Sequence, residues 1–362
     1  MKRVVVAMSG GVDSSLTAAL LKEAGYDVIG MMMQIWPEYE PARDHGGCCS
    51  LSAVEDARRV AHRLDIPFYV VNFRELFQKK VIDYFVEEYS HARTPNPCIM
   101  CNQKIKFEAL LKRALELDAD YIATGHYAKV VHNVNGRHLI KKATDSAKDQ
   151  TYTLWGMTQY QLAHTLFPLG EYTKEETRKM AKERNLPVHD KPDSQEICFI
   201  PDDDYGRFLR EHYPELVKPG PILDTNGNRV GTHDGLPFYT IGQRKGLGVA
   251  LGKPVYVVKL DPERNAVIVG ENSEVFGVGL IAGQLNWISI PELTEPMEVE
   301  VQIRYNSPPA KAVVYPLGED QVKVIFEDMQ RAITPGQSAV FYQGDVLVGG
   351  GIIMEEIKEI EK

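Results

Sequence analysis

The run Ser9-Gly10-Gly11-Val12-Asp13-Ser14-Ser15 combines glycines with hydroxyl side chains, between an apolar strand-like stretch (4–8) and a helical pattern (14–23). Glycines let the backbone approach an anion closely, and the opening amides of a helix point at the same place. An ordinary glycine-rich turn would explain Ser-Gly-Gly alone, but the added Val-Asp-Ser favours a phosphate site. The missing lysine excludes a Walker P-loop, and the lack of GxGxxG disfavours a dinucleotide fold.

A second chemical candidate is the pair Cys98 and Cys101, which follows two prolines and precedes a helical pattern. A thiol near a helix N-terminus has a lowered pKa, and Lys104 and Lys106 add positive charge. A zinc half-site would need a second pair at similar spacing, which the sequence lacks. Burial as structural thiols remains the alternative.

Cys198 stands almost a hundred residues further on, after the polar run Asp193-Ser194-Gln195-Glu196. A buried strand has no reason to carry such a run, so the segment is interpreted as functional. Cys48 and Cys49 are interpreted as non-essential residues of a loop, with His45 at the surface, and their roles stay undetermined. Five cysteines are too few for a disulfide framework.

The pattern between residues 2 and 124 alternates short apolar runs with helical stretches, which is typical of βαβ units and a parallel sheet. A hairpin is expected over 128–142, followed by a helical section over 150–185. Within that section, Thr173-Lys174-Glu175-Glu176 fits a capping box. The strands expected in the sheet are 4–8, 27–33, 67–72 and 120–124, and the helices are 14–23, 51–64, 74–89 and 102–117.

The composition changes along the chain and predicts three domains. Glycine and proline become frequent from Lys218, and beyond Gly277 the pattern is all β, with Met297 to Tyr305 alternating between apolar and polar residues. The predicted fold class is therefore α/β: a Rossmann-like parallel-sheet domain, a small β-rich central domain and a small C-terminal β-barrel. The expected boundaries are 1–204, including a helical extension, 205–276 and 277–362.

The charge balance limits the partners. A net charge of −9 means that the molecule as a whole does not attract nucleic acid, so RNA binding would need local basic patches. Such patches occur at Lys104 to Arg113 and at Arg137 to Lys148. No apolar run is long enough to span a membrane, and Met1-Lys2-Arg3 leads straight into a strand rather than a signal peptide, which predicts a cytoplasmic protein.

Two resemblances give these residues a context. SGGVDS resembles the PP-loop of the N-type ATP pyrophosphatases, which split ATP between its α and β phosphates to adenylate an oxygen. Over essentially its whole length, the chain resembles the bacterial tRNA-specific 2-thiouridylases (the MnmA/TrmU family). The ordered motifs that carry this resemblance are SGGVDSS, RTPNPCIMCNQKIKF, ATGHYA, KDQTY, DSQEICFIP, YTIGQRKGLG, IRY and TPGQ.

The family resemblance implies a sulfurtransferase that uses ATP with Mg²⁺ to adenylate C2 of the wobble uridine, U34, of lysine, glutamate and glutamine tRNAs. Sulfur then replaces that oxygen and gives 2-thiouridine, AMP and pyrophosphate. A cysteine desulfurase or a sulfur-carrier protein would load Cys198 with a persulfide, and Cys101 would be the second catalytic thiol. The two cysteines would finish as a disulfide. DNA and membranes are not expected partners.

The same resemblance assigns binding residues. Asn96, Pro97 and Cys98 would contact the target base. The residues implied to bind ATP are Ala7, Met8, Ser9, Gly10, Gly11, Val12, Asp13, Ser14, Met33 and Gly125. The residues implied to contact tRNA are His126, Lys148, Asp149, Gln150, Arg304, Tyr305 and Gln337.

Cys98 departs from the family pattern, because well-known members carry Asp at this position. Two interpretations stay open: the thiol of Cys98 acts as acid or base, or Cys98, Cys101 and Cys198 together hold a [4Fe-4S] cluster with one open iron. Two other classes of protein fit less well. A PP-loop amidating synthetase has no use for Cys101 and Cys198, and an RNA-binding adaptor would not need an intact SGGVDS.

Overall fold

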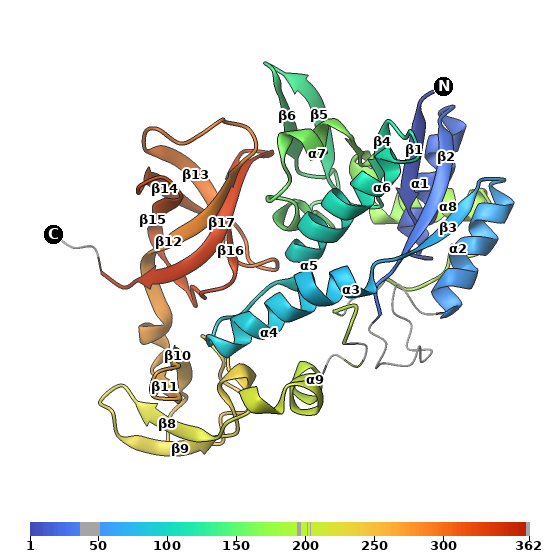
Figure 1. The fold of residues 1–362 in the computed structure, drawn as a ribbon. Helices are drawn as coiled ribbons and strands as arrows, with labels where there is room; N and C mark the ends of the chain where they lie inside the picture. The colour runs from blue at the N-terminus through green and yellow to red at the C-terminus, as the bar shows by residue number, and fades with distance from the viewer. Residues whose placement is uncertain (37–50, 194–196, 201, 203, 360–362) are drawn as a thin grey trace. The chain divides into compact units, whose positions relative to one another are not determined.

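The computed structural model describes residues 1–36, 51–193, 197–200, 202 and 204–359 (Figure 1). Cys48, Cys49, His45 and the 194–196 part of the polar run lie outside the described residues. The chain forms two compact units. The first contains residues 1–82, 97–203 and 345–347, and the second contains residues 83–96, 204–344 and 348–362.

The first unit is built on a parallel sheet in the order β3-β2-β1-β4-β7. Its central strand β1 pairs in register with β2 on one side, where Ala7 faces Met31, and with β4 on the other, where Val6 faces Ala123. The strands are β1 (Arg3–Ala7), β2 (Asp27–Gln34), β3 (Phe68–Asn72), β4 (Tyr121–Ala123) and β7 (Thr165–Leu166). The predicted Rossmann-like sheet is confirmed.

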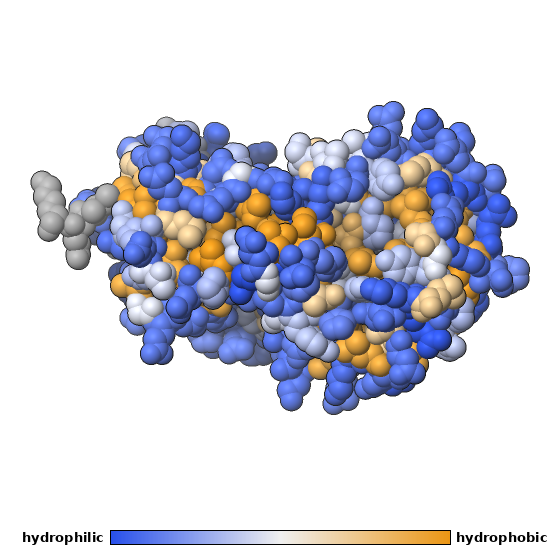
Figure 2. Space-filling model, turned by 90° about the horizontal axis from the view of Figure 1, so that it is seen from above, coloured by the Kyte–Doolittle hydropathy of each residue, from blue (hydrophilic) through white to orange (hydrophobic). Residues whose placement is uncertain are grey.

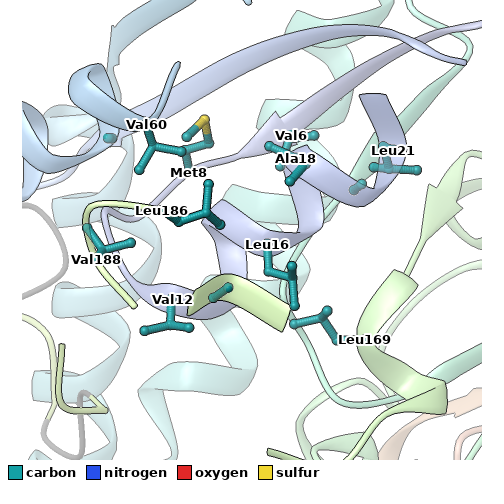
Figure 3. Packing of buried hydrophobic residues seen from close by; sticks show 14 of the residues in the cluster. Val6, Met8, Val12, Leu16, Ala18, Leu21, Val60, Leu169, Leu186 and Val188 are labelled. Carbon is teal, nitrogen blue, oxygen red and sulfur yellow. The ribbon is translucent and has the colours of Figure 1, made fainter. Parts of the chain in front are cut away.

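Helix α1 (Val12–Glu23) connects β1 to β2 and contributes to one buried apolar cluster. Val12 and Leu16 of α1 lie in this cluster with Met8, Leu169 and Leu186 (Figure 3). The remaining helices of this unit are α2 (Leu51–Arg63), α3 (Arg74–Phe77), η1 (Gln78–Ile82), α5 (Pro97–Met100), η2 (Cys101–Leu110), α6 (Leu111–Leu115), η3 (Thr151–Thr153), α7 (Gln159–Ala163), η4 (Pro168–Glu171) and α8 (Lys174–Glu183).

Two expectations for this unit are changed. The helix expected over 74–89 is divided into α3, η1 and α4 (Asp83–Ser90), and α4 belongs to the second unit. The helical section expected over 150–185 is broken by β7, which pairs with β4. The Ile122 amide donates to the His164 carbonyl oxygen, and the Thr124 amide donates to the Leu166 carbonyl oxygen. The capping box at Thr173 and Glu176 is confirmed at the start of α8.

The predicted hairpin is present as β5 (Lys129–Val134) and β6 (Arg137–Lys141). It does not join the parallel sheet. Instead, Ile140 and Lys141 of β6 pair with Leu347 and Val346, from the short segment 345–347 that belongs to the first unit.

The second unit contains a four-stranded sheet and a closed barrel. The four-stranded sheet has the order β10-β11-β8-β9, with a core that includes Ile222 and Val267. Its strands are β8 (Gly220–Asp224), β9 (Arg229–His233), β10 (Tyr256–Asp261) and β11 (Ala266–Gly270). The short helices of this region are α9 (Tyr205–His212), η5 (Pro214–Leu216), η6 (Leu236–Phe238) and η7 (Asn272–Val275).

The barrel follows the strand order β12-β15-β14-β13-β16-β17 and closes through pairing of β12 with β17. Alternate residues such as Val299 and Val301 point into its buried core, as the sequence pattern predicted. The strands are β12 (Phe276–Trp287), β13 (Met297–Gln302), β14 (Ala310–Pro316), β15 (Gln321–Arg331), β16 (Ser338–Gln343) and β17 (Val346–Ile357). The predicted C-terminal barrel is confirmed.

Hydrophilic residues cover much of the face drawn in Figure 2, with smaller apolar areas between them. Within the described ranges, no helix combines the length and apolar character needed to cross a membrane.

Candidate functional site

The SGGVDS run forms the connection from β1 to α1 at the centre of the parallel sheet. Its backbone is closed around Ser14, whose hydroxyl oxygen accepts a hydrogen bond from the Ser9 amide at 3.1 Å and lies 3.3 Å from the Ser9 hydroxyl oxygen. Gly11 caps α1 without any side-chain hydrogen bond. The opening amides of α1 therefore carry no side-chain cap at Gly11, and the positive end of the helix dipole lies at this loop.

Two glycines are required by the packing of this loop. Gly10 has φ +72°, and a Cβ atom there would lie 2.4 Å from the carbonyl oxygen of Ala53 in α2. Gly125 follows β4, and a Cβ atom there would lie 2.9 Å from the Cβ of Asp13 and from the backbone nitrogen of Ser14. The structure thus brings Gly125 against the start of α1, although more than a hundred residues separate them in sequence.

The candidate nucleotide residues share one edge of the sheet. Ala7 is the last residue of β1, Met33 is the penultimate residue of β2, and Gly125 follows β4. All three therefore lie toward the carboxyl ends of parallel strands. The chain order reverses on either side of β1, since β2 and β4 flank it. Open α/β sheets bind ligands at such a switch point, outside the carboxyl ends of the strands. The arrangement suits a nucleotide whose phosphates meet the SGGVDS loop.

A cluster of ion pairs lies beside the loop. The Lys174 ammonium donates to both carboxylate oxygens of Asp13, at 2.7 and 2.8 Å, and forms a 2.8 Å ion pair with Asp193. Asp193 also pairs with Lys148 at 3.0 Å and with Arg178 at 2.8 Å. Burial alone would raise the pKa of Asp193, but the hydrogen bonds from Lys174 and Lys148 outweigh it and hold that pKa at about 2.

The Tyr127 hydroxyl also contacts this cluster. It donates to the Asp13 carboxylate at 3.0 Å and lies 3.1 Å from the Thr177 hydroxyl oxygen. Burial and the neighbouring Asp13 charge raise the pKa of Tyr127, so this group stays a neutral donor at physiological pH. The Asp13 carboxylate therefore accepts hydrogen bonds from both the Lys174 ammonium and the Tyr127 hydroxyl.

The segment that leads to Cys198 is attached directly to the SGGVDS loop. The Lys191 ammonium donates to the Gly10 carbonyl oxygen at 3.1 Å and to the Asp56 carboxylate at 2.8 Å. Arg178 donates to the Lys191 carbonyl oxygen at 2.9 Å. Lys191 therefore contacts the candidate phosphate loop directly at Gly10. Asp193 is joined to Asp13 of that loop through the Lys174 ammonium.

The three described cysteines differ in exposure: Cys98 is exposed, Cys101 is buried, and Cys198 is partly buried. Pro97, Cys98, Cys101 and Cys198 all belong to the first unit. Phe199, next to Cys198, packs edge-to-face on Phe77 of α3 with ring centroids 5.8 Å apart. Helix α3 in turn contacts η2, the helix that begins at Cys101.

The helix that carries Cys101 begins earlier than expected. It opens at Pro97 as α5 and continues through η2, so Cys101 lies beyond the first turn rather than at the helix start. Among the residues that the structure describes, no three His, Cys, Asp or Glu side chains are grouped as metal ligands. The described arrangement does not group Cys98, Cys101 and Cys198 as ligands of one cluster.

The candidate tRNA residues of the first unit are engaged within the protein. His126 is buried, its Nδ1 lies 2.6 Å from the Thr124 hydroxyl oxygen, and burial followed by the Lys106 charge lowers its pKa well below the usual value. Asp149 accepts from the Ala143 amide at 2.8 Å. The Gln150 side chain accepts from the Tyr127 amide at 2.9 Å, and Lys148 pairs with Asp193 as described above.

The candidate tRNA residues of the second unit are Arg304, Tyr305 and Gln337, of which Arg304 contacts the Thr334-Pro335-Gly336-Gln337 loop and Gln337 belongs to it. Arg304 donates to the Ala332 carbonyl oxygen at 2.8 Å and to the Thr334 hydroxyl at 2.6 Å. The Gln337 amide donates to the Thr94 carbonyl oxygen at 2.7 Å. Tyr305 is exposed. The loop thus holds the backbone two residues before Asn96, within the same unit.

The sequence interpretation missed the cations beside the loop: Lys174, Arg178 and Lys191 were not among the candidates. One signal pointed to Lys191, since this residue lies two positions before the polar run that precedes Cys198. The other signal, the capping box, placed Lys174 at the first turn of a helix but gave no indication of which residue it contacts.

A parallel sheet with an SGGVDS loop after its central strand defines a nucleotide-binding α/β protein of the PP-loop class. Comparison with known proteins is more specific. The family described as tRNA methyl transferase HUP domain matches residues 2–202, the tRNA methyl transferase PRC-barrel domain matches residues 206–271, and the Aminomethyltransferase beta-barrel domain matches residues 278–353.

Relatives match over nearly the whole chain. A protein of Halothermothrix orenii named tRNA-specific 2-thiouridylase MnmA is 64% identical over 356 residues, which cover 98% of this chain and 99% of the relative. A protein of the same name from Carboxydothermus hydrogenoformans is 58% identical over 359 residues, covering 98% of each chain. The chain belongs to this family, the tRNA-specific 2-thiouridylases.

Solved structures are more distant. A 4-thiouridine synthetase–RNA complex with bound ATP is 18% identical, covers 59% of this chain and 51% of that chain, and has a TM-score of 0.35. A likeness at this level transfers neither function nor site geometry.

Proposed function

We propose that this protein is a tRNA-uridine 2-sulfurtransferase that converts the wobble uridine U34 of lysine, glutamate and glutamine tRNAs to 2-thiouridine. Membership of the 2-thiouridylase family supports tRNA as the substrate. The single structural observation that carries the mechanism is the direct attachment of residues 191–193, just before Cys198, to the SGGVDS loop.

The first step is adenylation. A pyrimidine carbonyl oxygen is a poor leaving group, so its attack on the α phosphate of ATP releases pyrophosphate and converts the oxygen into an adenylate ester, from which AMP can later leave. The α1 N-terminus and the hydroxyls of Ser9 and Ser14 supply donors for the departing phosphates. Mg²⁺ enters with ATP as part of that substrate. Asn96, Pro97 and Cys98 are proposed to contact the target base, which is turned out of the anticodon loop.

The second step is sulfur transfer. A cysteine desulfurase or a sulfur carrier first loads Cys198 with a persulfide. The terminal sulfur then attacks C2 and expels AMP, which leaves the base joined to Cys198 through a disulfide. The Cys101 thiolate attacks the Cys198 sulfur, releases the thiocarbonyl and forms a Cys101–Cys198 disulfide. An external thiol reductant returns both cysteines to thiols.

Cys98 is proposed to handle protons at the base. Its exposure in the first helical turn after Pro97 suits a group that exchanges protons with solvent. The variant Cys98→Asp restores the residue of well-known family members, and it should keep persulfide-dependent thiolation within a few-fold of wild type.

The test of the proposed function is reconstitution. The purified protein is incubated with ATP, Mg²⁺, unmodified lysine tRNA, cysteine and a desulfurase, under air and anaerobically, and the nucleosides are then analysed. Wild type should form 2-thiouridine, whereas Cys101→Ser and Cys198→Ser should not. Absence of 2-thiouridine from wild type under both atmospheres would refute the proposal, as would full activity of Cys198→Ser.

A further inference from the structure

Lys174 connects two carboxylates that are 180 residues apart in sequence. Its ammonium has three N–H donors, and these match three short contacts: two to Asp13 and one to Asp193. The Lys174 side chain is only 13% exposed, so water competes little for these contacts. Lys174 therefore links the PP-loop of the site to the segment that carries Cys198.

Asp193 fixes its own segment from several sides. One carboxylate oxygen contacts Lys174 and Arg178, and the other contacts Lys148. Arg178 additionally holds the backbone carbonyl of Lys191, two residues before Asp193. The segment is thus anchored at Asp193 on the near side of Cys198 and at Phe199, packed on Phe77, on the far side.

We propose that Lys174 and Asp193 are positioning residues, which hold the Cys198 segment against the PP-loop so that the persulfide sulfur reaches the adenylated base. This inference rests on the proposed function, since it requires that Cys198 carries the transferred sulfur. Neither residue touches the reacting atoms in this account. Their effect is on the step after adenylation.

The short length of chain between Asp193 and Cys198 explains why the ion pairs that anchor Asp193 matter for the position of the Cys198 sulfur. Five residues lead from Asp193 to Cys198, and an extended chain spans at most about 3.5 Å per residue, so the anchor keeps Cys198 within about 18 Å of Asp193. Without it, the nearest described anchor before Cys198 is Lys191, seven residues away, which is held by Gly10, Asp56 and Arg178, so the sulfur explores a larger volume. Misplacement of a reacting group by about 1 Å can reduce a rate about 100-fold, so a tenfold loss is a conservative expectation.

The other end of the same helix pair offers a matched control. Helices α1 and α8 also meet through Glu23 and Arg184, whose carboxylate and guanidinium form two 2.8 Å hydrogen bonds. Glu23→Gln removes an ion pair between these helices at a distance from the PP-loop and from residues 191–193. If the contact at Lys174 merely docked α8 on α1, Glu23→Gln and Lys174→Gln would have similar effects.

The experiment is a single-turnover measurement of two products from one reaction. Enzyme preloaded with a Cys198 persulfide is mixed with ATP, Mg²⁺ and unmodified lysine tRNA, and pyrophosphate and 2-thiouridine are both counted per tRNA. Wild type and Glu23→Gln should give the two products in about equal amounts. Asp193→Ala should keep the rate of pyrophosphate release within about threefold and lower 2-thiouridine at least about tenfold, and Lys174→Gln should lower 2-thiouridine at least about tenfold more than it lowers pyrophosphate release. The unused adenylate is then hydrolysed by water to uridine and AMP.

Several results would overturn the inference. Equal loss of both products in Asp193→Ala and Asp193→Asn would assign Asp193 to nucleotide binding or folding, and unchanged yields of both would show that the anchor is not needed. Additive losses in the double variant Lys174→Gln/Asp193→Asn would contradict a shared link. Failure of wild type itself to make 2-thiouridine would instead refute the proposed function, so the two failures are distinguishable.

Discussion

The substitution Gly10→Ala tests the geometry of the phosphate loop most sharply. Gly10 has φ +72°, and a Cβ atom would lie 2.4 Å from the backbone carbonyl oxygen of Ala53, where 3.0 Å is the shortest distance that real Cβ atoms show. The loop must therefore shift by at least about 0.6 Å, because a carbonyl in α2 cannot rotate away as a flexible side chain would. A displacement approaching 1 Å at a site that positions reacting atoms costs about 100-fold in rate.

The assay is tRNA-dependent pyrophosphate release as a function of ATP concentration. We expect kcat/KM for ATP to fall about 100-fold in Gly10→Ala. The control is Gly25→Ala, in the turn after α1, where φ is +84° but no atom lies within 4 Å of the added Cβ. Both variants carry the left-handed backbone strain of about 1–2 kcal/mol, and only Gly10→Ala carries the collision. Activities of the two variants within about twofold of each other would refute the reasoning.

Three further predictions concern other parts of the account. Gly125→Ala places a Cβ 2.9 Å from backbone atoms of Asp13 and should raise the KM for ATP about tenfold in the pyrophosphate assay. Gly336→Ala, at φ +90° and with a Cβ 2.9 Å from the Thr94 nitrogen, should lower thiolation of tRNA about tenfold while the KM for ATP stays unchanged. Asp193→Asn should lower the free energy of unfolding by about 1 kcal/mol above pH 4, since a depressed pKa stabilises the fold only where the carboxylate is ionised and solvent screens this partly exposed group. In urea titrations at several pH values, that difference should vanish as the pH falls from 3.8 toward 2, and a constant difference would contradict it.

Much of the fold could be predicted because burial leaves a local pattern. The apolar run at 4–8 and the helical period from Ser14 give β1 and α1 within a few residues. The alternation from Met297 gives β13. The strand β12 was harder to place, because glycines at 277, 279 and 283 are unusual in strands. Gly279 is required by tertiary packing, since a Cβ atom there would lie 2.3 Å from the Val324 carbonyl oxygen.

The local sequence pattern could not predict those elements whose position depends on contacts between residues far apart in the sequence. The helix expected over 74–89 has one continuous period, but periodicity does not show that its second half, α4, packs in the other unit. The two-residue strand β7 exists because its backbone pairs with β4, a choice made by tertiary structure.

The candidate site also contains residues that local motifs indicate and residues that only tertiary contacts reveal. The PP-loop and the cysteines could be proposed as candidates because each lies in a short motif of distinctive residue types. The contacts of Lys174 with Asp13 and Asp193 join positions with no fixed spacing, and charged residues in a helix usually face solvent, so sequence reasoning had no basis for pairing them. Cys101 and Cys198 belong to the same unit, and the proposal that both thiols act in one reaction builds on this placement.

The most direct measurement follows one sulfur atom. The protein is loaded at Cys198 with a ³⁵S persulfide, separated from the donor, and mixed with unmodified lysine tRNA with or without ATP, in the absence of reductant. The account predicts that the label moves into 2-thiouridine only with ATP, and that peptide mass spectrometry then finds a Cys101–Cys198 disulfide. Label that stays on the protein in the presence of ATP, or reaches tRNA without it, would contradict the account.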